Sequence, residues 1–326
     1  MANGTFIISL DFELMWGVRD KLSIAQYGGN ILGVHQVIPR LLKTFRQYGI
    51  HGTFSTVGLL FCENREELLA ACPTIRPAYT DTNLSPYNGY FDQVGVQGDA
   101  DLYHFAGGLI RQIQQYPEQE IGTHTFSHYY CLEDGQTNEQ FKADLEAAIR
   151  VAGRYNITLT SLIFPRNQFN DEYLKICGEL GITCYRGNER SWLYTAKNGE
   201  KETMIRRAFR LVDSYLNISG YNCYSDESLR GASPVNVPSS RFLRPFSPAM
   251  KPLEWLRMRR IKAAMTHAAK KNKVFHLWWH PHNFGIHQEA NFAFLEELLR
   301  HYSKLNKQYG FESRTMTEYA QKLIHG

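Results

Sequence analysis

The sequence predicts an α/β protein whose parallel sheet curves into a barrel. Short apolar, β-branched runs alternate along the chain with segments whose apolar residues recur at helical spacing. Most of the apolar runs end abruptly at a polar or ionisable residue. Chemistry in a (β/α) barrel is placed at the carboxyl ends of many strands, whereas an open sheet places it at one crevice. Polar residues after at least five runs therefore favour the barrel.

Six runs are expected to form the strands. They are Thr5–Leu10, Gly52–Val57, Glu120–Thr123, Leu159–Phe164, Ile182–Tyr185 and Val274–Trp279. The ionisable residues that follow them are Asp11, His124, Arg166, Arg186 and His280.

Four segments between these runs are expected to form helices. They are Val34–Tyr48, Leu102–Gln115, Asn138–Tyr155 and Asp171–Leu180. Gly49 and Gly181 are the expected stop signals of the first and last. Thr137 or Asn138 is the expected N-cap of the third helix, and Asn170 that of the fourth.

Two long stretches break this alternation. Residues 63–98 are rich in Pro, Asn, Tyr and Gly, and residues 189–244 carry mixed patterns with Pro234 and Pro238 and are followed by Pro245. Long irregular segments of this kind are usually lids or binding loops, so both are expected to be insertions at the barrel rim. Neither has the composition of a linker, and residues 1–326 are therefore expected to form one domain.

Composition excludes several functional classes. The 326 residues hold 36 Lys and Arg against 32 Asp and Glu, a net charge of +4, which argues against a dedicated nucleic-acid binder. Apolar residues make up 43% of the chain, which excludes disorder, and no run is long enough to span a membrane. The first residues lack a basic, then apolar, signal pattern, and six scattered cysteines form no CxxC pair. We therefore expect a cytoplasmic protein with free thiols, and a secreted protein with disulfides is the second choice.

Two motifs point to a metal site. Asp11 and Glu13 lie two apart at the end of the first strand, so their carboxylates point the same way, which is costly unless a metal ion or a proton compensates them. His124 and His128, in EIGTHTFSHYY, would share one face if the chain turned into a helix after its strand. The HxxxH spacing alone is weak evidence and is more typical of two ordinary loop histidines. The acidic pair Asp11 and Glu13 favours the interpretation of the two histidines as metal ligands.

A third motif, VFHLWWHPHNFG, holds the candidate for a general acid. Strand alternation places His276, Trp278 and His280 on one face, and His280 stands at the strand end, where a proton donor is needed. His276 is expected to pack inside the barrel wall, and His282 is either an orienting residue or simply exposed.

Residues after the fourth strand are candidates for substrate contact. Arg166 and Asn167 follow Pro165 and are expected to face the barrel mouth, where Arg166 would orient a carboxylate or bind substrate oxygens. An ordinary surface arginine is nearly as plausible. Trp279, Trp16 and Trp192 suit stacking on sugar rings and suit core packing equally well.

Taken together, these segments resemble the polysaccharide deacetylase (NodB-homology) family, carbohydrate esterase family 4, over roughly residues 5 to 285. The resemblance implies a distorted (β/α) barrel that removes acyl groups from N-acylated sugars with one divalent metal ion, commonly zinc. It implies that Asp11 is the general base, that Glu13, His124 and His128 are metal ligands, and that His280 is the general acid.

The sequence departs from the family pattern in three places. The usual adjacent acids are here Asp-Phe-Glu, so Asp11 and Glu13 could exchange roles. Ile163 stands about where the family has an arginine, and Arg166 is a possible substitute. The segment Gly187–Trp192 replaces the family's fourth motif.

The resemblance is closest to the branch that accompanies bacterial surface-polysaccharide and O-antigen synthesis, which implies a precursor sugar, nucleotide- or lipid-linked, as substrate. The alternatives are a hydrolase of a small non-sugar amide, such as an allantoinase-like enzyme, and a catalytically silent carbohydrate-binding module.

Overall fold

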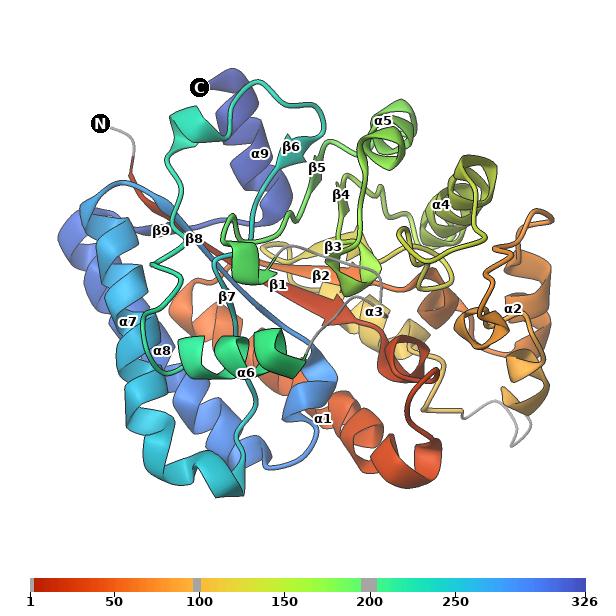
Figure 1. Ribbon diagram of the computed structural model, residues 1–326, viewed down its shortest axis with the longest axis horizontal. Coiled ribbons are helices and arrows are strands. Elements are labelled where there is room, and N and C mark those ends of the chain that lie inside the picture. Colours follow the sequence, from red (N-terminus) through yellow and green to blue (C-terminus); the bar gives the residue numbers. More distant parts are fainter. Residues whose placement is uncertain (1–2, 96–100, 195–203) are drawn as a thin grey trace.

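A computed structural model describes residues 3–95, 101–194 and 204–326, and it shows one curved sheet surrounded by helices (Figure 1). The strands are β1 (Thr5–Phe12), β2 (Gly52–Thr56), β3 (Glu120–Thr123), β4 (Ser161–Leu162), β5 (Cys184–Tyr185), β6 (Val235–Asn236), β7 (Arg241–Phe242), β8 (Val274–Trp279) and β9 (Glu312–Ser313). The helices are α1 (Ile24–Tyr48), α2 (Arg65–Ala71), α3 (Gly107–Gln114), α4 (Asn138–Gly153), α5 (Asp171–Glu179), α6 (Met204–Asp213), α7 (Glu254–Lys270), α8 (Gln288–Tyr309) and α9 (Met316–His325).

The strands run parallel in the order β6-β5-β4-β3-β2-β1-β8-β7, and β9 pairs with the start of β1. β1 is central and entirely buried, because TFIISLDF is apolar apart from Thr5, Ser9 and Asp11. Its neighbour β8 is in register from Thr5 opposite Val274 to Leu10 opposite Trp279. The end of the last long strand therefore lies beside the end of the first, and the predicted distorted (β/α) barrel is confirmed.

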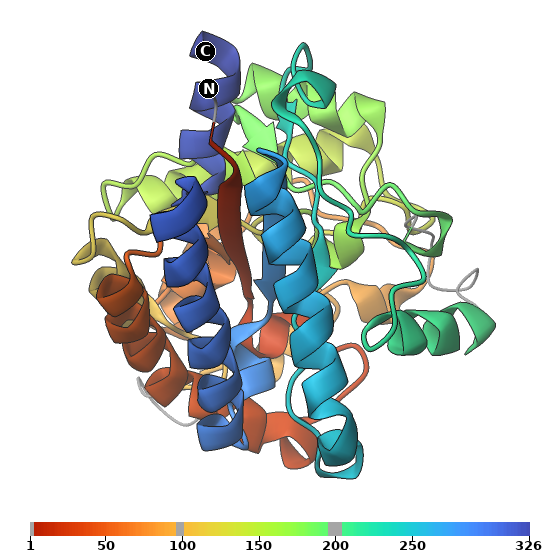
Figure 2. The same ribbon diagram turned by 90° about the vertical axis from the view of Figure 1, so that its left-hand side faces the viewer.

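Helices cover the outside of this sheet. Figure 2 shows α7 and α8 running side by side along the outer face of β1. Helix α1 packs against the short helix η10 (Pro281–Phe284), which follows β8. The two backbones meet at a glycine pair, because a Cβ on Gly33 would lie 2.1 Å from the carbonyl oxygen of Gly285. This close approach fixes the segment after β8 at the barrel mouth.

Helix boundaries follow the predicted caps at α4 and α5 but differ at the starts of α1 and α3. Helix α3 begins at Gly107, five residues after the predicted Leu102. The side chains of Thr137 and Asn170 accept the N-cap hydrogen bonds of α4 and α5, and Gly49 ends α1 in the left-handed conformation. Helix α1 begins ten residues before the predicted start, at a capping box formed by Ser23 and Gln26. Three glycines in its first turns had weakened the helical pattern of the sequence.

The expected second insertion is wrong in part, because residues 189–244 are not confined to the rim. They include α6 and the two short strands β6 and β7, which form the two edges of the main sheet. Strands of two residues leave almost no period-two pattern in a sequence, so they could not be distinguished from loop. Residues 63–98 match the expectation better, since in their described part they hold α2 and short 3-10 turns outside the sheet.

Two further observations concern the cysteines and the length of the apolar helices. All six cysteines are free thiols. Among the described residues, no helix is both long enough and apolar enough to cross a lipid bilayer.

Candidate active site

The two carboxylates stand at the carboxyl end of β1, in a buried position. Asp11 belongs to the strand and Glu13 follows it, and each is only 3% exposed. Space for the Glu13 carboxylate comes from Gly17 one turn later, because a Cβ there would lie 2.0 Å from the Glu13 Cδ. Any other residue at position 17 would displace the carboxylate.

The HTFSH segment reaches the same point without forming a helix, so the expected helical face is wrong. It is a tight loop after β3 in which Thr125 and His128 adopt the left-handed conformation, with φ of 63° and 60°. This conformation is unfavourable for residues with a β-carbon and has to be held by surrounding contacts. The loop, not helical spacing, brings His124 and His128 together.

Asp144, on α4, anchors this loop from behind. Its carboxylate accepts hydrogen bonds from the backbone N–H of Phe126 at 2.7 Å and of Ser127 at 3.1 Å, and from the Ser127 hydroxyl. Burial raises the pKa of Asp144 to about 6, although the donors around it act in the opposite direction. The anchor was not predicted, because an acid inside an amphipathic helix gives no sign of its role.

Glu13, His124 and His128 form a compact ligand group. Glu13 Oε2 lies 3.1 Å from His128 Nε2 and 3.3 Å from His124 Nε2. The three potential ligand atoms lie within 4.8 Å of one another, and all three residues are buried. Burial raises the pKa of Glu13, but the imidazoles around it more than offset this, and the pKa lies well below its usual range.

The other nitrogen of each imidazole is already occupied. His124 Nδ1 donates to the carbonyl oxygen of Ile163 at 2.8 Å, and His128 Nδ1 lies 3.1 Å from the Tyr130 hydroxyl. The Nε2 atoms are therefore the ones available to a metal, in the arrangement typical of ligating histidines. Burial lowers the pKa of His128, which favours the neutral form that a ligand needs. Two imidazoles and a carboxylate fit a divalent ion such as zinc.

Asp11 does not belong to the ligand group, and an arginine binds it instead. Arg186 Nη1 donates to Asp11 Oδ1 at 2.6 Å, and Arg186 Nη2 to Oδ2 at 2.8 Å. The guanidinium lies 4.1 Å from the Trp278 ring and is fully buried. Burial raises the pKa of Asp11, but Arg186 and the nearby imidazoles outweigh it and lower the pKa overall.

Arg186 was not assigned a role from the sequence, and Arg166 occupies a different place. Arg166 forms ion pairs with Asp20 and Glu133 and lies over the Tyr130 ring at 4.0 Å. The structure therefore does not bring Arg166 to Asp11. Asn167 does reach this region, where its Oδ1 accepts a hydrogen bond from Arg186 Nη2 at 3.0 Å. Arg186 follows a two-residue strand, and its position after Tyr185 was the only available signal.

The histidines of β8 are arranged as alternation predicts. His276 is fully buried below the site, with Nε2 2.8 Å from the Ser9 hydroxyl and Nδ1 3.1 Å from the Val237 carbonyl oxygen. Burial lowers its pKa to about 3, so it is neutral. His276 is a packed histidine of the barrel wall, as expected.

His280 lies at the open side of the site. Its Nε2 is 3.6 Å from Asp11 Oδ2 and 3.7 Å from Glu13 Oε1, and its side chain is 24% exposed. His282 stacks on it with ring centroids 4.9 Å apart, and His282 Nδ1 lies 3.8 Å from Glu13 Oε1. His282 is 4% exposed, and burial lowers its pKa to about 3. His282 is therefore not an exposed residue, whereas His280 has both solvent and carboxylates within reach.

The structure places the tryptophans differently from what the sequence predicts. Trp279 points away from the barrel interior, is 0% exposed, and stacks on Phe284, so it packs the core and offers no face to a sugar. Trp16 is 1% exposed and donates to the His104 carbonyl oxygen. The side chain of Trp192 lies outside the described part of the chain. Trp278 is the partly exposed tryptophan next to His280 and Arg186.

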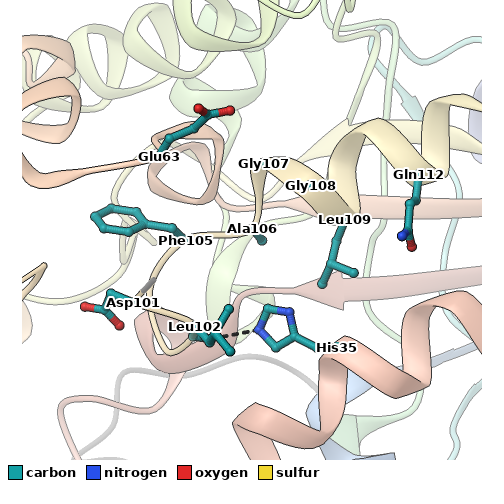
Figure 3. Close-up of a pocket in the computed structure, with 10 residues that line it drawn as sticks. All are labelled: His35, Glu63, Asp101, Leu102, Phe105, Ala106, Gly107, Gly108, Leu109 and Gln112. Carbon is teal, nitrogen blue, oxygen red and sulfur yellow. Dashed lines mark hydrogen bonds between the residues drawn. The ribbon is translucent and has the colours of Figure 1, made fainter. Parts of the chain in front are cut away.

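A separate pocket of about 470 Å³ lies between α1 and the start of α3 (Figure 3). It contains His35, Glu63 and Asp101, but each already has a partner in the protein: Leu102, Arg111 and His104 respectively. None of the predicted site residues lines it. The mouth of the barrel therefore remains the candidate active site.

Comparison with known proteins bears on the family and on the fold. The family model for polysaccharide deacetylases matches residues 29–185, which include His124, His128 and strand β5. No curated protein sequence matches the chain. The match to the family model, over just under half of the chain, supports the polysaccharide deacetylase family that the sequence resembles.

Solved structures agree at the level of the fold. A protein from Mycobacterium smegmatis described as a polysaccharide deacetylase is 14% identical, with a TM-score of 0.59 over 99% of this chain and 91% of the other. The allantoinase PuuE is 9% identical, with a TM-score of 0.53 over 97% and 88%. A branching enzyme of the GH57 type from Pyrococcus horikoshii is 12% identical, with a TM-score of 0.52 over 99% and 71%.

Proposed function

We propose that the protein is a metal-dependent hydrolase that removes an acetyl or formyl group from an N-acylated sugar. The observation that carries this proposal is the meeting of three kinds of group at one barrel mouth. Glu13 and the two histidines form a ligand set, Asp11 is held by Arg186, and His280 lies between the carboxylates and solvent. Binding of a sugar alone requires no such combination, which disfavours a silent module.

The divalent ion, most simply zinc, would be held by Glu13, His124 and His128 and would polarise the amide carbonyl and the attacking water. The protein's own groups then handle the protons. Asp11 is ionised and accepts a proton from water, while Arg186 keeps both its oxygens in place. His280 donates a proton to the departing nitrogen, because an amine anion is a very poor leaving group.

We assign the roles of the two acids from their partners. Glu13 faces the Nε2 atoms of both histidines, whereas both oxygens of Asp11 are engaged by Arg186. This supports Glu13 as the ligand and Asp11 as the base. The third motif of the sequence supplies the acid, in His280.

The role of His280 predicts a dependence on the leaving group. His280→Ala is expected to retain metal and fold, yet to lose about 10²–10⁴-fold in turnover of N-acyl substrates. Activated phenyl esters should be affected much less, because a phenolate departs without protonation. Comparing kcat/KM on both substrate types measures the difference. An equal loss on both would remove His280 from the role of acid and leave His282, which stacks on it, as the candidate to test.

The Arg186–Asp11 pair predicts a shift in the pH profile. Arg186 lowers the pKa of Asp11, so Arg186→Lys, which loses the two-pronged hydrogen bonding, should raise that pKa. Since the base must be ionised, the rising acidic limb of kcat/KM should move to higher pH, by on the order of one unit. Arg166→Lys is the control, because Arg166 pairs with Asp20 and Glu133 instead. Identical profiles for the two variants would contradict the role of Arg186.

The substrate that we favour is a precursor sugar of bacterial surface polysaccharides, acted on in the cytoplasm. Asn167 and the partly exposed Trp278 lie next to Arg186, where a sugar ring would reach them, while Arg166 stands farther out with Tyr130. Free and nucleotide-linked N-acetyl and N-formyl sugars should release acetate or formate. A small non-sugar amide is the alternative, favoured by the shared fold of the allantoinase PuuE. Ring opening of allantoin or cyclic imides, with no acetate or formate released from sugars, would select that alternative.

A further inference from the structure

Helix α6 presents its apolar side to solvent, contrary to the usual arrangement of a surface helix. Ile205, Phe209 and Val212 recur at helical spacing, and Leu216 continues the row because its N–H donates to the Val212 carbonyl oxygen at 2.9 Å. These four side chains are 69%, 44%, 42% and 52% exposed, in that order. Exposed large apolar side chains usually occur singly, whereas a row of them marks an interaction surface.

Charged residues fix this orientation of the helix. Asp213, at the end of α6, is fully buried and accepts a hydrogen bond from Arg241 at 2.5 Å, with Arg260 of α7 at 3.7 Å. Arg206 is 7% exposed and donates to the Leu193 carbonyl oxygen. Rotating α6 to bury its apolar row would pull Asp213 away from two buried arginines. The apolar row is therefore held outward by the ion pairs on the inner side.

The surrounding part of the chain is strongly basic. Residues 204–273 contain 14 Lys and Arg against 4 Asp and Glu, although the whole chain has 36 against 32. Among the described side chains of this segment, the exposed basic residues are Arg230, Lys251, Arg259, Lys270 and Lys271. Figures 1 and 2 show that the helices of this segment, α6 and α7, lie on the same side of the molecule.

The same segment concentrates exposed apolar side chains. Of the 14 large apolar residues that are exposed in the described chain, half fall within residues 204–273. They include Leu253 and Trp255 at the start of α7, 38% and 60% exposed, next to the exposed Lys251. Asp213 and Arg260 tie the end of α6 to α7. We call the four apolar residues of α6, together with Lys251, Leu253, Trp255 and Arg259, the α6–α7 face.

We propose that the α6–α7 face binds the surface of an anionic lipid bilayer. Aliphatic and aromatic side chains beside Lys and Arg are what a helix needs to lie at a membrane interface, where tryptophan is also enriched. Negative lipid headgroups complement the excess of positive charge in this segment. A second copy of the chain would bring an equally basic face against it, and like charges oppose such a contact. The inference does not depend on the deacetylase activity.

The experiment is co-sedimentation of the full chain with large unilamellar vesicles. Vesicles of phosphatidylglycerol and phosphatidylcholine are compared with vesicles of phosphatidylcholine alone. The wild type should bind the anionic vesicles, and raising the ionic strength should weaken binding. Phe209→Asn with Leu216→Asn should lower the partition coefficient by about tenfold or more, because two apolar insertions are lost. Lys251→Glu with Arg259→Glu should lower it on anionic vesicles only.

A matched control uses apolar residues of similar exposure elsewhere. Leu32→Asn with Leu69→Asn changes side chains that are 39% and 50% exposed on α1 and α2, and it should bind vesicles like the wild type. Circular dichroism establishes that each variant is folded. Equal binding by the α6 variant and the control, or failure of the folded wild type to bind anionic vesicles, would overturn the proposal. So would a dimer in light scattering that the α6 variant dissociates, because the row would then be covered by a second copy.

Discussion

Replacing His124 or His128 with alanine is expected to strip the metal from the protein and to abolish turnover. Each imidazole directs Nε2 at Glu13, and Nδ1 is already engaged by Ile163 or Tyr130, so no neighbouring nitrogen can take over. Loss of a residue that merely orients a ligand costs 10–100-fold in metal affinity, and loss of a ligand should exceed about 100-fold. Elemental analysis of the purified variants and their kcat/KM on an N-acetyl sugar measure both effects.

A histidine away from the mouth provides the control. His35→Ala removes an imidazole that donates to Leu102 at the separate pocket of Figure 3. It should keep one metal ion per chain and full activity. Equal metal content in the wild type, His124→Ala and His128→Ala would show that these histidines are not ligands.

Asp11→Asn and Glu13→Gln are expected to fail in different ways. Asp11→Asn should retain the metal and lose activity by about 10²–10⁴-fold, because the base is missing while the ligand group is intact. Glu13→Gln should weaken metal binding itself, because a neutral amide replaces the carboxylate that faces both imidazoles. Metal content and kcat, measured on the same preparations, separate the two roles.

The Asp11 variant should also be less stable, because it leaves the buried charge of Arg186 without its partner. Breaking a buried ion pair by removing one member costs about 3–5 kcal/mol, so urea unfolding should show a lower free energy of unfolding. If Asp11→Asn lost the metal and Glu13→Gln kept it, the two assignments would have to be exchanged. Full activity and full metal content in both variants would reject the site.

The long strands of the fold could be predicted because each carries its own signal. Thr5–Phe12 and Val274–Trp279 are mostly apolar runs, and Glu120–Thr123 was found with its observed limits. β6 and β7 were missed because two residues show no alternation, and their place is set by pairing with β5 and β8. The start of α1 was missed because its glycines serve a tertiary contact, at Gly33, rather than helix formation.

The residues that meet at the barrel mouth were easier to predict than the residues that hold them in place. Asp11, Glu13, His124, His128 and His280 were expected from their positions after strands, and the structure brings all five together. Arg186 could not be assigned, because nothing in the sequence says which of several arginines folds back on Asp11. For the same reason, the sequence did not show that Asp144 holds the HTFSH loop. Trp279 was taken for a mouth residue, although strand alternation with His280 turns it outward into the core.

Residues 237–240 close the barrel in an unusual way. They connect β6 to β7, which lie at opposite edges of the sheet, and their backbone bonds to both sides. Val237 and Ser239 donate to the carbonyl oxygens of Tyr185 and Gly187, while Ser240 donates to that of His276. The circumference of the barrel is therefore set by the length of this connection. Most connecting segments absorb an added residue at little cost, but an insertion here would spread the two edges and carry Arg186 away from Asp11 on the opposite wall. The length of this four-residue connection therefore determines how far apart the two edges of the sheet lie.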